Sequence, residues 1–595
     1  MNQNFTTRPE ILGTFGVVTS THWLATAVGM GILERNGNAF DAAIAAGFVL
    51  QVVEPHLNGP GGEVPILAWR AGEAEPHVIC GQGVAPQAAT IQRFEALGMK
   101  LVPGTGLLPA VVPGAFDAWM LLLRDFGTFS LEDILAPAIS YAERGFPIVT
   151  RAVQSIYAAR DLFLNHWPSS AEVWLPHGRW PAPNSLHATP AIAATYRRII
   201  AEAKAAGADR VSQIEAARRA FYNGFVAEAV DRFYRSELID SSGRRNIGLL
   251  AGSDMAAWRA TVEHPLSYDY RGLRVYKTGP WGQGPVFLQQ LALLSGFDLE
   301  GMEPNGPDFV HTIVESAKLC LADRDVYYGD PNYADVPIKT LLSNAYNDRR
   351  RKQIGESASQ EIRPGDLPAG RGRFERIAER AGCETPAGLG HGEPTFADLP
   401  EVEGDTVHLD VIDRFGNAVS ATPSGGWLQS SPVVSGLGFP LNTRGQMFWL
   451  LDGLPSSLSP GRRPRTTLTP TLVGRDGAPY MAFGTPGGDQ QDQWTLTFFL
   501  RHILHGLNLQ ESIDAPMFNT KHYVTSFYPR SIQLGGLLME SRFPATTVEA
   551  LRRRGHRVTL EGDWSLGRVC AASITGGLLR AAATPRFMQG YASGR

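Results

Sequence analysis

The chain changes character near residue 405, and this boundary constrains its fold more than any other feature. Proline and glycine crowd residues from about 349 to 405, so the sequence predicts a long irregular surface segment there. A stretch of that length without regular structure is uncommon inside a compact domain, and it is usually functional or mobile. We therefore expect residues 349–405 to be mobile.

A regular β pattern begins directly after this segment. Residues 406–413 read Thr-Val-His-Leu-Asp-Val-Ile-Asp, which predicts a strand with Val407, Leu409 and Val411 on one face. The chain then turns and returns through residues 418–422. The sequence thus predicts a β-hairpin that opens at Thr406.

Other segments show helical or strand periodicity of their own. Apolar residues recur at helical spacing in some of them and form short apolar runs in others. Gly506 follows the last apolar residue of one such helix and is a plausible stop signal. The expected helices are 21–33, 41–53, 115–126, 131–144 and 493–504, and the expected strands are 16–18, 64–69, 274–277 and 481–484.

Length and composition narrow the function classes. The 595 residues fit about four ordinary domains or one large α/β domain. A net charge of −4 gives no general attraction to nucleic acid or to an anionic membrane. No apolar run is long enough to cross a membrane, and no secretory signal is visible, so we expect a soluble cytoplasmic protein. The four scattered cysteines support neither a zinc site nor a disulfide framework.

Two glycine-rich turns allow both a structural and a functional interpretation. Residues 58–63 join a predicted helix to a strand, and Gly487-Gly488 join a strand to a helix. Glycine there permits a positive φ or a close backbone approach, which a plain turn and a ligand loop both use. Thr466 and Thr467 can likewise be read as ordinary capping hydroxyls.

The order and spacing of these pieces resemble the γ-glutamyltransferase (γ-glutamyl transpeptidase) family. The resemblance covers nearly the whole chain and is specific for the superfamily, less so for the substrate. In the N-terminal half it rests on TSTHWLATAVGMGILERNGNAFDAAIAAGFVLQVVEPH, VPGAFDAW, YRGLRVYKTGP and LADRDVYYGDP. In the C-terminal half it rests on DTVHLDVIDRFGNAVSATPS, RRPRTTLTPT, FGTPGGD and ATPRFMQGYA.

The resemblance implies an N-terminal-nucleophile hydrolase, an α/β protein built as a four-layer αββα sandwich. It also implies an inactive precursor that cuts itself between Asp405 and Thr406. Residues 1–405 would form a large subunit, and residues 406–595 a small one. The two subunits would be partners from one precursor, and a dimer of such heterodimers is one arrangement left open.

The chemistry of threonine fits this processing. A threonine hydroxyl is a weak nucleophile without a base, and an internal threonine has no free amine to help it. Cleavage before Thr406 frees an α-amino group with a pKa near 7.7–8.0, which can serve as the local base. On this interpretation the protein requires no metal and no organic cofactor, and its reaction partner is a small molecule.

The same resemblance assigns roles to residues around the nucleophile. Gly487 and Gly488 would supply backbone N–H groups to the oxyanion, where losing one donor costs about 2.7–4 kcal/mol in other hydrolases. Ser424, where the family usually has threonine, would contact the amine of the nucleophile. Thr466 and Thr467 replace a usual serine pair and could still donate hydrogen bonds.

The chain departs from the family where the family holds a free amino acid. The family's R-E-x-A-P segment, whose arginine binds the α-carboxylate, reads Gln82-Gly83-Val84-Ala85-Pro86 here. Its L-N-N-Q-M-D-D-F segment, whose acid binds the α-ammonium, has lost both acids, and Gly426 stands where an asparagine is usual. The positions expected to line the substrate site are Gln82, Arg444, Gln446, Met447, Thr466 and Thr467.

These losses argue against a γ-glutamyl substrate. Each lost charged partner in a desolvated pocket is worth roughly 3–5 kcal/mol. Losing both should weaken γ-glutamyl recognition by on the order of 10⁴-fold, even without additivity. Arg444 could grip a carboxylate at another place, and Trp427, Phe448 and Trp449 could make the acyl pocket apolar.

The bond that is cleaved stays open on the sequence alone. It could be an amide, as in the acylases that share this fold, or a C–C bond next to a ketone. The chain resembles the divergent family members of lincosamide and pyrrolobenzodiazepine pathways, which remove an oxalyl-type group. A genuine glutathione hydrolase and a catalytically inactive binding homologue are the two alternatives.

Overall fold

Two seven-stranded sheets stack face to face at the centre of the protein. The structure is a computed structural model that describes residues 5–384 and 406–595. The first sheet has the order β21 (Tyr591–Gly594), β2 (Gly16–Ser20), β12 (Leu409–Asp413), β13 (Ala418–Ala421), β3 (Val64–Trp69), β4 (His77–Gly81) and β9 (Thr261–Glu263). The second has the order β1 (Ile11–Gly13), β20 (Leu578–Ala583), β19 (Cys570–Thr575), β15 (Ala478–Gly484), β14 (Thr471–Arg475), β11 (Leu273–Lys277) and β10 (Leu266–Tyr270).

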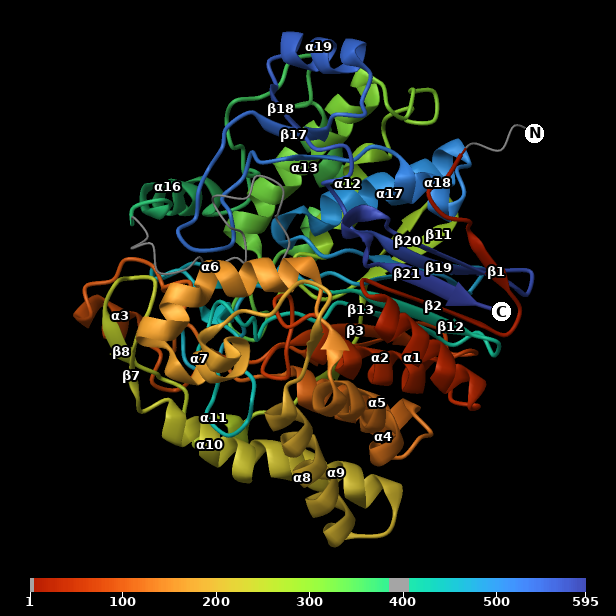
Figure 1. Ribbon diagram of the computed structural model, residues 1–595. Coiled ribbons are helices and arrows are strands. Elements are labelled where there is room, and N and C mark those ends of the chain that lie inside the picture. Colours follow the sequence, from red (N-terminus) through yellow and green to blue (C-terminus); the bar gives the residue numbers. More distant parts are fainter. Residues whose placement is uncertain (1–4, 385–405) are drawn as a thin grey trace.

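Helices cover the outer face of each sheet, so the core is a four-layer αββα sandwich (Figure 1). This confirms the expected fold. On the first sheet lie α1 (Trp23–Glu34), α2 (Ala39–Val53) and α4 (Ala115–Phe126), and α5 (Leu131–Arg144) packs on α2. On the second lie α12 (Pro285–Leu294), α17 (Gln491–His505) and α18 (Leu509–Asp514), and α13 (Pro307–Tyr327) packs on α12.

Smaller elements surround this core. Helices α3 (Ile91–Ala96), α6 (Thr150–His166), α7 (Pro168–Trp174), α8 (Pro190–Ala206), α9 (Arg210–Tyr222), α10 (Phe225–Phe233) and α11 (Gly252–Ala257) belong to the N-terminal half. Next come α14 (Ile338–Leu341), α15 (Asn344–Arg351), α16 (Gly370–Arg380) and α19 (Ala545–Arg553). A three-stranded sheet joins β16 (Phe518–Thr520), β17 (Gly536–Glu540) and β18 (Arg557–Glu561). Short hairpins pair β5 (Phe146–Pro147) with β6 (Leu186–His187) and β7 (Glu237–Ile239) with β8 (Arg245–Ile247).

The hairpin of β12 and β13 forms where the alternating pattern predicts it. Val407, Leu409 and Val411 all pack in the apolar core that also contains residues of α1 and α2. On the opposite face the His408 ring lies against Gly484 of the second sheet. His408 Nε2 is 2.9 Å from Asp410 Oδ1, so these polar side chains are paired between the sheets. Period-two alternation thus separates the helix-facing side of β12 from its sheet-facing side.

Both sheets contain strands from either side of residue 405. In the first sheet β2 lies between β21 and β12, and β13 pairs with β3. In the second sheet β1 pairs with β20, and β11 pairs with β14. Each sheet therefore continues across the predicted boundary, and cutting the chain there would leave the two pieces joined by backbone ladders.

The segment predicted to be irregular contains a helix. Helix α16 occupies residues 370–380, and Ile377 on it is fully buried. The expectation of a structureless stretch from 349 is therefore wrong for its first part, because a buried apolar residue anchors a helix despite the surrounding glycines. Residues 385–405, including Asp405, lie outside the described part of the chain.

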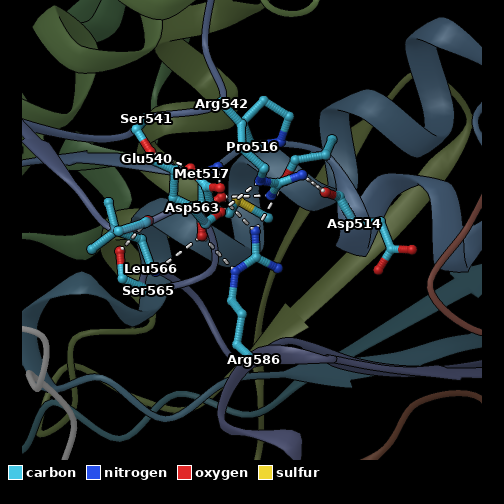
Figure 2. Close-up of polar contacts among 12 residues, drawn as sticks. Asp514, Pro516, Met517, Glu540, Ser541, Arg542, Asp563, Ser565, Leu566 and Arg586 are labelled. Atoms are coloured by element: carbon cyan, nitrogen blue, oxygen red, sulfur yellow. Dashed lines mark hydrogen bonds and ion pairs between the residues drawn. The ribbon is translucent and has the colours of Figure 1, made fainter.

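A buried carboxylate holds the C-terminal turn in place. Figure 2 shows two guanidinium groups converging on Glu540. Arg586 donates to Glu540 at 2.7 and 2.9 Å, and Arg542 donates at 2.6 Å. The backbone N–H groups of Met517 and Leu566 complete its shell at 3.1 Å each. Since Arg586 lies just before β21, this cluster fixes the approach of the edge strand to the first sheet.

The burial of His187 can be tested through the pH dependence of stability. Its ring stacks on Trp174 and is 5 % exposed, and burial lowers its pKa to about 4. The unfolded chain binds the proton near pH 6.5, so stability from this group is present above pH 6.5 and is lost as pH falls toward 4. Between pH 7.5 and 5 this loss is about 2 kcal/mol.

We therefore expect His187→Gln to flatten the pH dependence of stability by about 2 kcal/mol over that range. Urea unfolding of both proteins at pH 7.5 and 5 measures it. Parallel pH dependences in the two proteins would contradict the assignment.

Among the described residues, no helix is long and apolar enough to span a bilayer. The cysteines are unpaired, with Cys383 exposed and Cys80, Cys320 and Cys570 buried.

Candidate active site

The residues singled out from the sequence gather at one end of both sheets. In the first sheet this is the end where β12 begins and β13 finishes, because antiparallel pairing sets Leu409 opposite Ala421. In the second sheet it is the end where β15 finishes and β14 begins. A Cβ on Gly484 would lie only 2.3 Å from the His408 ring, so these two ends meet.

Thr406 lies at this end with its side chain next to a second hydroxyl. It is fully buried and forms an isolated antiparallel bridge with Ser424. The two side-chain oxygens are 3.2 Å apart. The backbone N–H of Val407 donates to Pro423 O at 3.0 Å, which continues the hairpin ladder up to this pair. The structure thus brings together the two hydroxyls that the sequence assigned to catalysis.

Arg444 and Glu63 form a buried ion pair that holds Ser424. Both side chains are 0 % exposed, and Arg444 Nε donates to Glu63 Oε1. Arg444 Nη2 donates to Ser424 Oγ, and the Glu63 and Ser424 backbones exchange hydrogen bonds of 2.8 and 3.0 Å. Ser424 Oγ thus accepts from Arg444 and lies 3.2 Å from Thr406 Oγ1. This is a positioning role for Arg444, in addition to any contact with substrate.

An apolar wall stands on the other side of this guanidinium. The Arg444 guanidinium lies 4.8 Å from the ring centroid of Trp427 and 5.7 Å from that of Phe527. Trp427, Met447 and Phe527 form one buried cluster. Phe448, by contrast, packs in a separate apolar cluster. Trp449 belongs to a third cluster, where Arg530 stacks on it at 3.9 Å.

The Gly487-Gly488 turn follows directly from the strand end that touches His408. Gly487 has φ +127° and Gly488 φ +53°, both unfavourable for other residues. A Cβ on Gly487 would meet the Trp494 ring at 2.2 Å. Among the described residues the backbone N–H groups of these two glycines donate to no acceptor. Two adjacent unoccupied donors at this end of the sheets suit an oxyanion, as the sequence predicted.

Thr466 and Thr467 precede β14 at the same end. The Thr466 N–H donates to Trp281 O at 2.9 Å, and its hydroxyl accepts from Leu468 N at 3.4 Å. The Thr467 hydroxyl is buried and has no hydrogen-bond partner. Thr466 is therefore engaged in the local turn, whereas Thr467 keeps a hydroxyl available.

The remaining predicted substrate positions divide into two kinds. Gln82 follows β4 at this end, is 1 % exposed, and has no hydrogen-bond partner for Oε1. Gln446 accepts from the Tyr528 N–H at 3.1 Å and donates to Thr443 Oγ1 at 3.2 Å. Gln446 thus cross-links two loops, and Met447 packs in the apolar cluster described above.

A second buried ion pair at this end escaped the sequence analysis. Arg568 Nη2 lies 3.3 Å from Glu54 Oε1, and Thr21 Oγ1 donates to Glu54 Oε2 at 2.7 Å. The Arg568 N–H donates to Thr485 Oγ1 at 2.9 Å, next to the glycine turn. Burial raises the pKa of Glu54, and Arg568 opposes that shift. Only the fold brings these residues, far apart in sequence, to one place.

One trio of described side chains has the spacing of metal ligands. His311, Glu315 and His556 are buried with their ligand atoms within 4.8 Å of one another. Glu315 already accepts from Lys318 at 2.6 Å, and Arg363 is 3.3 Å from its other oxygen. A metal would have to compete with two cations there, so this trio fits a hydrogen-bonded core better than a metal site.

The arrangement as a whole suits acyl transfer through a hydroxyl nucleophile. A buried threonine hydroxyl is aligned by a serine, which an arginine–glutamate pair holds in turn. Two backbone donors lie at the facing strand end, where an oxyanion would form. The nucleophile, its positioning group and an oxyanion site are the parts that such chemistry requires.

The chain is similar to known proteins over nearly its whole length. The family model for gamma-glutamyltranspeptidase matches residues 25–594. A curated relative, the glutathione hydrolase-like YwrD proenzyme of Bacillus subtilis strain 168, is 30 % identical over 97 % of this chain and 98 % of its own. A solved structure of LmbA2991 is 52 % identical with a TM-score of 0.93 over the full length of both chains. The cephalosporin acylase of Bacillus halodurans is 28 % identical with a TM-score of 0.81, covering 100 % of this chain and 98 % of its own. The chain therefore belongs to the gamma-glutamyltranspeptidase family and is an enzyme of that family with an N-terminal-nucleophile hydrolase fold.

Proposed function

We propose that the protein is an autoprocessed threonine hydrolase that cleaves an acyl bond of a small carboxylate-bearing substrate other than a simple γ-glutamyl peptide. The observation that carries this is the joint arrangement at one sheet end of Thr406, Ser424 and the Gly487-Gly488 turn. Cleavage between Asp405 and Thr406 would give subunits 1–405 and 406–595. The freed amine of Thr406 would then act as base for its own hydroxyl.

The residues expected to bind the substrate support a substrate other than a simple γ-glutamyl peptide. Gln82 and Met447 stand where the family has a carboxylate-binding arginine and an ammonium-binding acid. Met447 lies in an apolar cluster with Trp427 and Phe527, an environment that penalises a bound ammonium group. Arg444, the cation nearest the nucleophile's partner, is already engaged by Glu63. The site thus keeps the acyl-transfer machinery and lacks the family's amino-acid clamp.

The comparisons support a substrate outside the glutathione class. Identity to LmbA2991 is 52 %, against 27 % for several relatives named glutathione hydrolase proenzymes. Relatives named acylase proenzymes are 29–30 % identical to this chain, and the glutathione hydrolase-like YwrD proenzyme is 30 % identical. An amide bond and a C–C bond beside a ketone both fit a threonine nucleophile facing an oxyanion site. A role in secondary-metabolite biosynthesis follows from the resemblance to the C–C bond-cleaving members of the family.

A matched pair of chromogenic substrates tests the proposal. Glutaryl-p-nitroanilide has the carboxylate and chain length of γ-glutamyl-p-nitroanilide but lacks its α-ammonium group. We expect kcat/KM for the glutaryl compound to be at least about tenfold higher, since no acid replaces the lost clamp and the site is apolar there. Initial rates of the processed protein with both compounds measure the ratio. Faster turnover of the γ-glutamyl compound would establish the glutathione hydrolase alternative instead.

A further inference from the structure

Several buried polar side chains near the nucleophile have hydrogen-bonding groups without a partner among residues 5–384 and 406–595. His56 is 3 % exposed, and neither of its ring nitrogens has a partner. Asn58 is 1 % exposed, and both atoms of its side-chain amide lack partners. Gln429 is 5 % exposed, and its Oε1 also lacks one. Most buried polar side chains in proteins are satisfied, so five such atoms on neighbouring paired segments point to a ligand.

These three residues, here called the polar wall, lie on segments that pair with one another and with the residue after Ser424. Gln429 Nε2 donates to His56 O at 3.0 Å, which holds the two segments together. Asn58 pairs in a parallel bridge with Gly425. Gly425 is the residue next to the serine whose hydroxyl lies 3.2 Å from that of Thr406. Asn58 therefore pairs with the residue that directly follows Ser424, the neighbour of the reacting hydroxyl.

Two arginines, Arg151 and Arg568, bring positive charge close to His56. The Nε of buried Arg568 has no hydrogen-bond partner, although its other end pairs with Glu54. Arg151 and Arg568 both stack on Phe587, at 3.3 and 4.9 Å from its ring centroid. Burial, and then the two arginines, lower the pKa of His56 well below its ordinary value, so its ring is neutral at neutral pH. One nitrogen of a neutral imidazole donates and the other accepts.

We propose that His56, Asn58 and Gln429 form a subsite that binds a carboxylate together with a neutral hydrogen-bond donor on its neighbouring carbon. The N–H groups of His56, Asn58 and Arg568 suit the carboxylate oxygens. The carbonyl oxygens of Asn58 and Gln429 suit an adjacent hydroxyl or N–H group. This deepens the proposed function, on which it rests, by naming the substrate class as 2-hydroxy acids, hydrated 2-oxo acids or their imino counterparts.

The local charge excludes the amino-acid form of the same ligand. Arg151 and Arg568 repel an ammonium group, and the Glu54 carboxylate is already engaged by Thr21 and Arg568. A substrate that offers a neutral donor beside its carboxylate gains both sets of hydrogen bonds without that repulsion. The subsite thus discriminates by charge as well as by hydrogen bonding.

Three ligands that share a carbon skeleton test the discrimination. L-Lactate carries the carboxylate and the hydroxyl, L-lactamide lacks the charge, and L-alanine carries an ammonium group. We expect the protein to bind lactate at least about tenfold more tightly than either analogue, because only lactate matches the charge and both hydrogen-bonding sets. Saturation-transfer NMR titrations at pH 7.5 measure the three affinities without any turnover.

Variants of the wall then locate the binding. His56→Ala should weaken lactate binding about tenfold, and Asn58→Asp, which adds a negative charge at constant size, should abolish it. Gln429→Leu provides a third variant if His56→Ala fails to fold. His187→Gln is the matched control, since His187 is also buried with an unpartnered ring nitrogen but lies outside the site. Its affinity for lactate should equal that of the unmodified protein.

The outcomes separate this inference from the proposed function. Equal affinity for the three ligands, or unchanged lactate binding in Asn58→Asp and Gln429→Leu, would overturn the subsite even if the protein hydrolyses acyl substrates. Selective lactate binding that these variants remove would support the subsite even if no acyl substrate is turned over. Failure of processing or turnover bears only on the proposed function.

Discussion

Thr406→Ala should remain a single chain of 595 residues and lose activity, whereas the unmodified protein should give fragments of 405 and 190 residues. The substitution removes the only atom assigned to nucleophilic attack in both processing and turnover. The expected loss of rate is about 10⁴-fold or more, by analogy with the removal of a nucleophile in other hydrolases. Denaturing electrophoresis shows the fragments, and N-terminal sequencing of the smaller one should begin Thr-Val-His-Leu.

Two controls make this result specific. Thr406→Ser keeps a hydroxyl and should still process, more slowly. Thr195 on α8 is another buried threonine, and its hydroxyl donates to Leu437 O at 3.0 Å. Thr195→Val removes this hydroxyl and should process normally. Processing of Thr406→Ala would remove the nucleophile assignment. A single intact band from the unmodified protein after long incubation would favour the inactive binding homologue.

The second large effect is expected at Arg444. Arg444→Ala leaves the fully buried Glu63 carboxylate without its guanidinium, which should lower the free energy of unfolding by roughly 3–5 kcal/mol. Ser424 loses a donor at the same time, so its hydroxyl is no longer held toward Thr406. Processing should slow by about 10²-fold, the scale of a small misplacement of a catalytic group. Chemical unfolding and the rate at which the small fragment appears measure the two effects.

A double variant separates charge from positioning. Glu63→Gln combined with Arg444→Met removes both charges at similar volume, so stability should recover in large part while processing stays slow. Arg444→Lys keeps the charge and a donor but loses the planar fork, so its processing rate should fall between those of the unmodified protein and Arg444→Ala. If Arg444→Ala costs less than about 1 kcal/mol, the ion pair does not have the energetic role given to it here.

The sequence predicted the strand and helices that surround the site because their patterns depend on residues adjacent in sequence. The alternation of Val407, Leu409 and Val411 marks one strand face, and the observed strand buries that face against α1 and α2. Helix α4 matches its predicted limits, and Gly506 ends α17 with φ +68°. Periodicity and stop signals depend on neighbours in sequence, so they can be read without a structure. The expected irregular segment failed at α16 because one buried isoleucine outweighs several glycines.

Other features depended on contacts between distant segments. Glu63 ends a glycine-rich loop, and that loop was the one sequence signal that could have identified Glu63 as a site residue. Its ion pair with Arg444 joins positions that are 381 residues apart in the sequence. Arg568 and Glu54 are 514 apart, and no local pattern marks either as part of the site. The unsatisfied atoms of His56, Asn58 and Gln429 likewise become visible only when every neighbouring partner is known.

The sequence by itself predicted the hairpin that opens at Thr406 and several of the helices and strands around it, and its resemblance to the family indicated which residues of the amino-acid clamp are changed. Only the tertiary structure showed that Arg444 turns inward to Glu63 and Ser424, and that buried polar atoms of His56, Asn58 and Gln429 have no partner among the described residues. The physical reason is that hydrophobic periodicity is a property of adjacent residues. The electrostatic state of a buried group depends instead on charges and hydrogen bonds from segments that meet only when the two sheets stack.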